Sequence, residues 1–429
     1  MRKLAFFSSC LVVACAFASA SAAPGDNWPQ FRGPSGQGYS SEKNLPLLWG
    51  GPDNKNVFWK SPLKGEGHAS PIVWGDRIFV CTVFWHDDVK DRKEVIPDHY
   101  ITCYSAKDGS QLWQKQVKSG PWKRNDFRSG PGGGYAGPTP CTDGKHVYVV
   151  FGSSVIAALD YEGNEVWRKE IVPYTFDVTI GTSPLLYKDT LLFACLMAKK
   201  QDSKLIAYDT RTGEVKWQTP LPETGFGHST PLMIEVSGKP QLLVAAGAMG
   251  EGGAAMQSLD PSNGKRSWWC KGGGEASSPV FADGIVYFDS GRGGKGTAVS
   301  PAGAGDVSAS HIKWTTGNLG EAIGSPIIVG DHVYRLVSGG VLRCWSTKTG
   351  EEAYSTRVKT SSTWISPIAD ANGRIYFASA GKSFVVQAGA EFKLLAENDL
   401  GDSNHASPAV VDGKLILVGT KHIWCIGEK

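Results

Sequence analysis

A pattern that recurs eight times along the chain constrains its fold more than any other feature. Each copy begins with a small residue, a proline and an apolar pair. A turn of the Asp-Gly, Gly-Asp or Asn-Gly type then leads into a strand rich in β-branched and aromatic residues. The anchor prolines are Pro71, Pro138, Pro184, Pro231, Pro279, Pro326, Pro367 and Pro408. Repeats of about 40–50 residues built from short strands are typical of propeller blades, because one such unit cannot bury both faces of its sheet.

The second copy shows how a unit divides into four strands. A short strand ends before the turn Asp143-Gly144, and further strands are expected at 146–151, 155–159 and 165–168. Asp and Asn stabilise tight turns, and glycine supplies the positive φ that many of them need. The sequence therefore predicts four-stranded antiparallel blades.

The outer end of most units carries a glycine followed four residues later by tryptophan. The clearest pairs are Gly109 and Trp113, Gly163 and Trp167, Gly213 and Trp217, and Gly264 and Trp268. A ring of this size on an outer strand buries a large apolar area when it wedges against the next sheet. We expect these tryptophans to pack between blades.

The last unit has strands at 409–411, 415–419 and 422–426, and then the chain ends. Residues 57–60, which carry Trp59, have the character of the missing fourth strand. Pairing the two ends would remove an open sheet edge. The predicted fold is all-β: an eight-bladed β-propeller of four-stranded antiparallel blades, formed by residues 24–429 as one domain and closed by an N-terminal strand in the last blade.

Residues 1–23 have the character of an export signal. Arg2 and Lys3 precede an apolar stretch, and small residues follow it. We expect a periplasmic or secreted protein; the alternative is a lipoprotein anchored through Cys15. With 44 Lys and Arg against 41 Asp and Glu, charge does not indicate nucleic-acid binding. No segment after the leader is long and apolar enough to predict a transmembrane helix, and we expect a monomer.

The stretch Ala207-Tyr208-Asp209-Thr210-Arg211-Thr212-Gly213-Glu214-Val215-Lys216-Trp217 resembles the tryptophan-docking repeat of the pyrroloquinoline quinone (PQQ) enzyme-like propellers. That family includes quinoprotein alcohol dehydrogenases and the outer-membrane assembly lipoprotein BamB. The opening Asn27-Trp28-Pro29-Gln30-Phe31-Arg32-Gly33-Pro34-Ser35-Gly36 resembles the start of many exported bacterial proteins of this group. The resemblance implies the propeller fold, with either quinone-dependent oxidation or protein binding as the activity.

The motifs that accompany quinone chemistry in that family are missing from the sequence. Its dehydrogenases carry two adjacent cysteines and a calcium site of Glu, Asn and Asp, whereas Cys270 here follows Trp269 and precedes Lys271. We therefore assign no catalytic residue, no metal ligand and no cofactor; PQQ with calcium remains the alternative. Seven cysteines follow the leader, and we expect Cys81 and Cys103 to form a disulfide.

The segments leading into the innermost strands share one end of the ring, which we call the mouth, and propeller ligands commonly bind at such loop-lined openings. The position three residues before each anchor proline samples it: His68, Tyr135, Gly181, His228, Ala276, Ile323, Trp364 and His405. We take its histidines and aromatic residues as candidate ligand contacts. The alternative is that the histidines only bond local backbone.

Three further candidates come from long or glycine-rich connectors expected at the mouth. Arg128 lies in the insertion before Gly132, Glu251 lies in the connector 245–253, and Arg292 lies in the connector Ser290–Gly296. The function predicted is a non-catalytic binding or scaffold protein of the cell envelope, with an envelope protein or small ligand at the mouth. The alternatives are a PQQ-dependent alcohol or sugar dehydrogenase with a rearranged site, and a carbohydrate-binding or lyase-like propeller.

Overall fold

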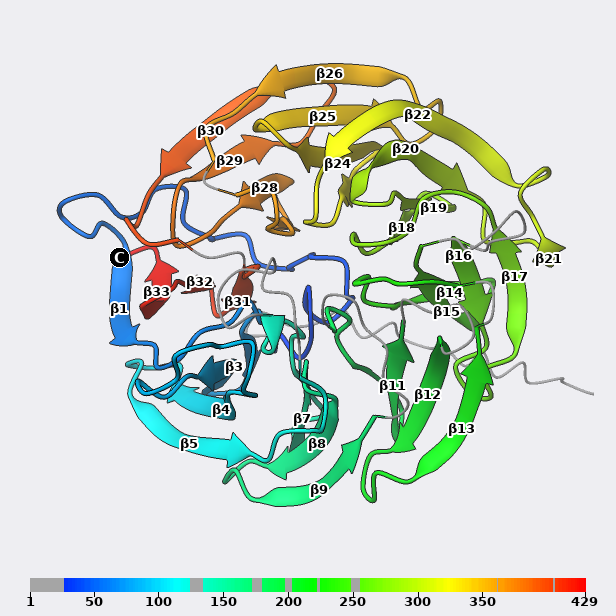
Figure 1. Ribbon diagram of the computed structural model, residues 1–429. Helices are drawn as coiled ribbons and strands as arrows, with labels where there is room; N and C mark the ends of the chain where they lie inside the picture. Colours follow the sequence, from blue (N-terminus) through cyan, green and yellow to red (C-terminus); the bar gives the residue numbers. More distant parts are fainter. Residues whose placement is uncertain are drawn as a thin grey trace, which may run out of the picture.

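The computed structural model describes residues 27–123, 134–171, 180–196, 203–221, 224–247, 255–360, 362–403 and 406–429. Their strands form eight sheets that stand as blades around a ring (Figure 1). The predicted eight-bladed propeller is confirmed. Among these described residues, no helix is long and apolar enough to cross a membrane.

The strands of each blade are given from the channel outward. Blade 1 consists of β2 (Ile72–Trp74), β3 (Arg77–Phe84), β4 (Asp98–Ser105) and β5 (Gln111–Val117), and blade 2 of β6 (Cys141–Thr142), β7 (His146–Phe151), β8 (Val155–Asp160) and β9 (Glu165–Glu170). Blade 3 consists of β10 (Leu185–Tyr187), β11 (Thr190–Cys195), β12 (Lys204–Asp209) and β13 (Val215–Pro220), and blade 4 of β14 (Leu232–Val236), β15 (Lys239–Ala245), β16 (Met256–Leu259) and β17 (Arg266–Cys270). Blade 5 consists of β18 (Val280–Ala282), β19 (Ile285–Phe288), β20 (Arg292–Val299) and β22 (Ile312–Glu321), and blade 6 of β23 (Ile327–Val329), β24 (His332–Val337), β25 (Val341–Ser346) and β26 (Glu352–Arg357). Blade 7 consists of β27 (Ile368–Ala369), β28 (Arg374–Phe377), β29 (Ser383–Gln387) and β30 (Lys393–Asn398), and blade 8 of β31 (Ala409–Val411), β32 (Lys414–Val418), β33 (His422–Gly427) and β1 (Val57–Pro62). A short strand, β21 (Gly305–Asp306), leaves blade 5 and pairs in parallel with β17 of blade 4.

The two ends of the chain meet in blade 8, as the sequence predicts. β1 pairs antiparallel with β33, with Trp59 opposite Cys425 and Pro62 opposite His422. Figure 1 shows the blue β1 beside the red β33 at the rim of the ring. The N-terminal strand thus covers an edge that would otherwise be free to pair with another chain.

A closed ring of hydrogen bonds joins all eight blades at their innermost strands. In each blade, the backbone N–H of the residue before the anchor proline donates to the hydroxyl of the equivalent residue in the next blade, over 2.9–3.1 Å. The members are Ser70, Thr139, Ser183, Thr230, Ser278, Ser325, Ser366 and Ser407. The anchor of blade 2 is therefore Pro140, and the prediction of Pro138 was wrong by two residues, because Gly137-Pro138 and Thr139-Pro140 both fit the pattern of a small residue before proline.

The outer-strand tryptophans wedge between blades. Trp167 of β9 donates its indole N–H to the carbonyl of Thr210 in blade 3 over 2.9 Å. A Cβ added to Gly213 in the same turn would stand 2.6 Å from that indole, so glycine is required where the ring packs. Trp59, Trp113 and Trp314 repeat both contacts in the following blades. Trp268 differs, because it donates to Gln241 within its own blade.

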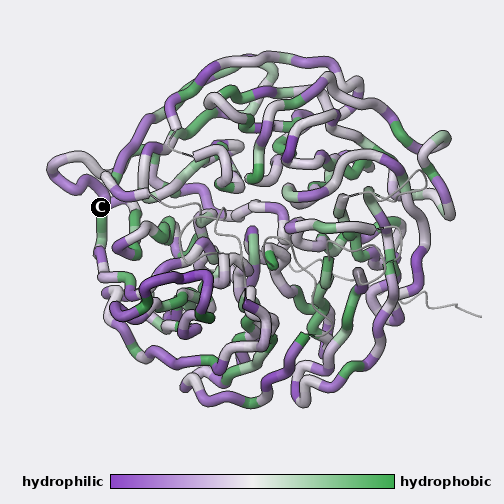
Figure 2. The backbone as a smooth tube through the Cα atoms, viewed as in Figure 1, coloured by the Kyte–Doolittle hydropathy of each residue, from purple (hydrophilic) through white to green (hydrophobic). Residues whose placement is uncertain are grey.

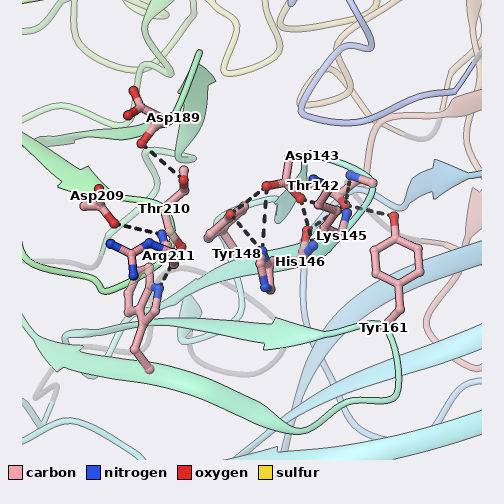
Figure 3. Close-up of polar contacts among 12 residues, drawn as sticks. Thr142, Asp143, Lys145, His146, Tyr148, Tyr161, Asp189, Asp209, Thr210 and Arg211 are labelled. Atoms are coloured by element: carbon pink, nitrogen blue, oxygen red, sulfur yellow. Dashed lines mark hydrogen bonds and ion pairs between the residues drawn. The ribbon is translucent and has the colours of Figure 1, made fainter.

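The turns between strands are held by aspartates, as the turn chemistry predicts. Asp143 accepts hydrogen bonds from the backbone of Lys145 and His146 and from the hydroxyl of Tyr148 (Figure 3). In blade 3, Asp209 accepts the N–H of Arg211 over 3.0 Å, and the Thr210 hydroxyl donates to the carbonyl of Asp189. These bonds fix the loop against which Trp167 packs.

The core lies between the blades rather than in one central mass. In blade 3 the second and third strands are almost wholly buried, whereas the outer strand β13 alternates between exposed and half-buried residues. Figure 2 shows this as hydrophilic colour concentrated along the outer rim.

All seven described cysteines are buried, free thiols. The predicted Cys81–Cys103 disulfide is wrong, because Cys81 lies opposite Ile101 and Cys103 opposite Phe79.

Residues 27–50 form a segment that we call the strap, which crosses the end of the ring opposite the mouth. Every innermost strand runs from the mouth to that end, and the strap bonds to residues within or after those strands and, in blade 6, to Pro326 directly before β23. Figure 1 shows this blue segment crossing the middle of the ring. Its hydrogen bonds reach Val73 in blade 1, Thr142 in blade 2, Phe281 in blade 5, Pro326 in blade 6 and Ala369 in blade 7. The strap thus connects five blades across the ring.

Candidate functional site

The mouth is built from the segments that precede the innermost strands. With Pro140 as the anchor of blade 2, the position three residues before each anchor reads His68, Gly137, Gly181, His228, Ala276, Ile323, Trp364 and His405. Tyr135 is thus not equivalent to the others. It has no solvent exposure and packs between Trp85 and His99, so the structure removes it from the predicted mouth.

His68 and His228 are half-buried and help to join neighbouring blades through their backbones. The N–H of His68 donates to the carbonyl of Ala136 over 2.9 Å, and that of His228 to the carbonyl of Glu275 over 2.7 Å. The imidazole of His228 lies edge-on to Phe226, with ring centroids 4.6 Å apart. It also fills the space beside Gly181, where any side chain would collide with it. The imidazole of His228 in blade 4 therefore also fills the space that a side chain at the equivalent position of blade 3, Gly181, would take.

Trp364 is half-buried on the segment that leads into blade 7. Its backbone N–H is held by the hydroxyl of Ser362 over 3.0 Å. A Cβ added to Gly324 of blade 6 would stand 3.0 Å from the carbonyl carbon of Trp364. The two blades therefore meet backbone to backbone there, and the indole is the part of this contact that can reach a ligand.

Arg292 lies between two carboxylates. Its Nη1 is 2.9 Å from Oε1 of Glu321, and its Nε is 3.4 Å from Oε1 of Glu275. Most of the connector predicted at Ser290–Gly296 is instead strand, because β20 begins at Arg292, which pairs with Glu321 of β22. A ligand anion at Arg292 would have to compete with both glutamates.

A hollow of about 360 Å³ opens beside His68, between blades 1 and 8. It is lined by Leu63, Gly65, Glu66, Gly67, Gly419, Thr420 and Lys421. Arg92, in the loop between β3 and β4, pairs with Glu66 over 3.1 Å at the edge of the hollow. Asp402 accepts the backbone N–H groups of Thr420 and Lys421. The hollow is therefore lined by Glu66, whose carboxylate is paired with Arg92, and by Lys421, on a frame with three glycines.

Behind this part of the mouth lies a buried aromatic cluster around His99. The imidazole of His99 stacks on Phe151 with ring centroids 4.6 Å apart, and its Nε2 is 2.6 Å from the Ser153 hydroxyl. Burial lowers the pKa of His99 to about 3. His99 is thus a neutral core residue that supports the mouth and cannot reach a ligand there.

Three of the predicted contacts, Arg128, Glu251 and His405, lie outside the described residues, as do the leader and Cys15. Sequence reasoning missed a buried group of charges, Arg32, Asp289 and Arg335, each 1% exposed. The sequence signal for Arg32 is the stretch Phe31-Arg32-Gly33-Pro34, which resembles the start of many exported bacterial proteins of the PQQ-like group.

The residues described at the mouth do not supply the donor set for PQQ with calcium. Calcium takes six to eight oxygen ligands, several of them from carboxylates. No group of three or more His, Cys, Asp or Glu suited to a metal occurs within the described ranges. Arg292, a natural partner for a quinone carboxylate, is already paired with two glutamates. We derive no step through this cofactor.

Comparison with known proteins agrees with the ring of blades. The family described as outer membrane protein assembly factor BamB matches residues 49–172, 98–241 and 152–371. The quinoprotein glucose dehydrogenase of Escherichia coli (strain K12) is 33% identical over an alignment of 116 residues, and the match covers 24% of this chain and 14% of that enzyme. The match therefore spans only a small part of the enzyme's length.

Two solved structures have the same fold at low identity. BamB from Moraxella catarrhalis superposes with a TM-score of 0.60 and 13% identity, covering 87% of this chain and 97% of that one. The quinohemoprotein alcohol dehydrogenase from Comamonas testosteroni superposes with a TM-score of 0.64 and 15% identity, covering 96% of this chain and 82% of that one. These similarities establish the propeller architecture, but a shared fold does not determine function, which has to be argued from the residues of the site.

Proposed function

Since the chain belongs to the family of the outer membrane protein assembly factor BamB, we propose that it is an exported, non-catalytic propeller that binds an envelope protein or a small ligand at its mouth. The observation that carries this proposal is the hollow of about 360 Å³ between blades 1 and 8, beside the half-buried His68. It lies among the loops of the mouth, on a ring whose blades the strap holds together with bonds to five of them.

The chemistry of the mouth suits recognition of a polar surface with an aromatic or apolar anchor. Glu66 and Lys421 at the hollow present both signs of charge, and Trp364 and His228 present rings on rigid backbone. Aromatic residues on a fixed frame bind with little loss of conformational entropy, which favours them in protein interfaces. The leader at 1–23 and the periplasmic or secreted location are part of this proposal.

Site-specific crosslinking tests the proposal. A photo-crosslinking phenylalanine analogue at position 364 places the probe at the mouth, and the same analogue at the exposed Lys43 places it on the strap. We expect adducts in intact cells from position 364 and none from position 43, with Lys421→Glu reducing the yield from 364. Equal adducts from both positions, or a yield that Lys421→Glu leaves unchanged, would contradict a specific site at the mouth.

A PQQ-dependent oxidoreductase is the second candidate, favoured by the shared fold of the quinohemoprotein alcohol dehydrogenase and by the local identity to the glucose dehydrogenase. It differs from the first candidate in requiring turnover of an alcohol or sugar by the chain loaded with PQQ and calcium. Dye reduction under those conditions separates the two.

A further inference from the structure

The strap presents an arginine at the channel in an unusual backbone conformation. Arg32 has a φ of 61°, in the left-handed region that residues with a Cβ rarely adopt. Two nearby positions, Gly33 and Gly38, are glycines because neighbouring groups leave no room for a side chain there. A Cβ on Gly33 would stand 2.7 Å from the ring of Trp28, and one on Gly38 would stand 2.6 Å from the carbonyl oxygen of Pro367. Strained conformations of this kind persist where the surroundings require a side chain in one place.

The guanidinium of Arg32 is only partly satisfied by the protein. Its Nη2 donates to the carbonyl of Gln37 over 2.8 Å and to the carbonyl of Pro326 over 2.7 Å. Its Nε and Nη1 are buried and have no hydrogen-bond partner among the described residues. Three N–H bonds, one on Nε and two on Nη1, therefore point into the interior with no acceptor among the described residues.

A second buried arginine holds the same segment of blade 6. Arg335 of β24 donates to the carbonyls of Ala322 and Gly324, while Arg32 takes the carbonyl of Pro326, two residues further on. Arg335 has a counterion, because its Nη2 lies 2.8 Å from Oδ1 of Asp289. Two buried cations thus share one segment, but only one of them is paired with a carboxylate in the described structure.

The remaining neighbour of Arg32 cannot balance its charge. Tyr39 donates its hydroxyl to the carbonyl of Ile328, and burial raises the pKa of Tyr39 to about 12, so the phenol is neutral at pH 7. Burial, with Arg335 adding to the effect, lowers the pKa of Arg32 to about 9, which still leaves the guanidinium protonated at pH 7. A buried cation without a counterion is strongly unfavourable.

We propose that the strap and blade 6 form a binding site for a small anion, held by Nη1 or Nε of Arg32. The ligand class is a halide, a small oxyanion or the carboxylate of a small organic acid, since each of them accepts a charge-assisted hydrogen bond from a single guanidinium nitrogen. Glycine at position 38 keeps the guanidinium uncovered by side chains on that side. This site lies inside the ring, where the strap meets the segment that leads into blade 6, and its test does not depend on the proposed function of the mouth.

Bromide is the direct probe, because its anomalous scattering identifies its position. Crystals of the full mature chain soaked in sodium bromide are expected to show an anomalous peak within hydrogen-bond distance of Arg32 Nη1 or Nε. A peak absent from this position, or density that refines as water only, would overturn the proposal.

Thermal unfolding at constant ionic strength gives a second readout and identifies the class of anion. Chloride, phosphate and acetate each replace a bulky sulfonate in separate titrations. The anion that fits is expected to raise Tm by about 3 °C at a concentration 100-fold above its Kd. Arg32→Gln should abolish this rise, whereas Arg374→Gln, which removes a cation paired with Asp370 in blade 7, should retain it. An equal response in both variants, or no response to any anion in the wild type, would contradict the site. If Arg32→Gln does not fold, the wild-type bromide map decides.

Discussion

The backbone N–H of Ser407 in blade 8 donates to the hydroxyl of Ser70 in blade 1 over 3.0 Å. This bond completes the circle of eight equivalent bonds at the innermost strands. The pairing of β1 with β33 closes the same blade at the rim. The ring is therefore locked twice, once near the axis and once at the outside, which explains how the mouth and the strap are held on a rigid frame.

Ser70→Ala should destabilise the protein, because it leaves the buried N–H of Ser407 without an acceptor. The expected loss in the free energy of unfolding is about 1–3 kcal/mol, measured by urea denaturation. Ser70→Thr is the matched control, since Thr139 and Thr230 fill the same role in blades 2 and 4. If Ser70→Ala and Ser70→Thr were equally stable, the hydroxyl ring would have no energetic role.

Gly213→Ala tests the wedge of Trp167. Gly213 has a φ of 68°, and its Cβ would meet the indole at 2.6 Å. Gly330→Ala is the control, because Gly330 has a similar φ of 59° with nothing within 4 Å of its Cβ. Both variants incur backbone strain of about 1–2 kcal/mol, and Gly213→Ala should lose about 1–3 kcal/mol more from overpacking. Equal losses on denaturant unfolding would rule out a tightly packed indole.

Trp28→Ala tests how the strap is anchored. Trp28 is 2% exposed and exchanges backbone hydrogen bonds with Val73 of blade 1. Removing the indole should cost about 3–5 kcal/mol, whereas Phe84→Ala, at a residue 42% exposed, should cost less than half as much. Hydrogen exchange should then show faster labelling of residues 27–50 in Trp28→Ala. Unchanged exchange in the strap would mean that Trp28 does not anchor it.

His99 should make stability depend on pH between about 3 and 6.5. Its folded pKa is lowered to about 3, below its usual value near 6.5. The unfolded chain therefore takes up a proton in this window while the folded protein does not. The contribution of the neutral His99 to the free energy of unfolding is fully present above pH 6.5 and is lost as the pH decreases toward 3. His99→Phe, which keeps a ring stacked on Phe151, should reduce the loss between pH 7 and pH 5 by about 2 kcal/mol. Parallel curves for the two proteins would contradict a neutral buried His99.

The cysteines should be inert in the folded protein. All seven described thiols are buried and free, and burial raises the pKa of Cys103 to about 12. A thiol reagent at pH 8 should label none of them in the native mature chain and all seven after unfolding in denaturant. Dithiothreitol should leave Tm unchanged. Labelling of two fewer thiols after unfolding without reductant would reveal a disulfide.

The blades and their closure could be predicted because their signals are local and repeated. The turn at Asp143, the strand 146–151 and the closing strand at 57–60 each follow from a few adjacent residues and from periodicity. The register of blade 2 could not be fixed, because two successive small-residue and proline pairs fit equally well. Only the hydroxyl ring, a contact between blades, distinguishes Thr139 from Gly137.

The candidate site was less predictable, because it depends on segments that do not repeat. Nothing in the spacing of Arg32 places it beside Pro326, 294 positions away, and nothing in the sequence places Glu275 and Glu321 on either side of Arg292. Tyr135 was assigned to the mouth from a register error of two residues. Periodicity therefore predicted the frame, whereas the strap and the ion pairs required three-dimensional contacts.

Reconstitution with PQQ and calcium is the most direct test of the central claim that this propeller binds at its mouth without catalysing oxidation. The purified mature chain is incubated with PQQ and calcium, and dye reduction is then followed with a panel of alcohols and sugars, alongside a quinoprotein dehydrogenase as the positive control. The account predicts no turnover above a heat-denatured blank. Substrate-dependent dye reduction that requires both PQQ and the folded chain would contradict it.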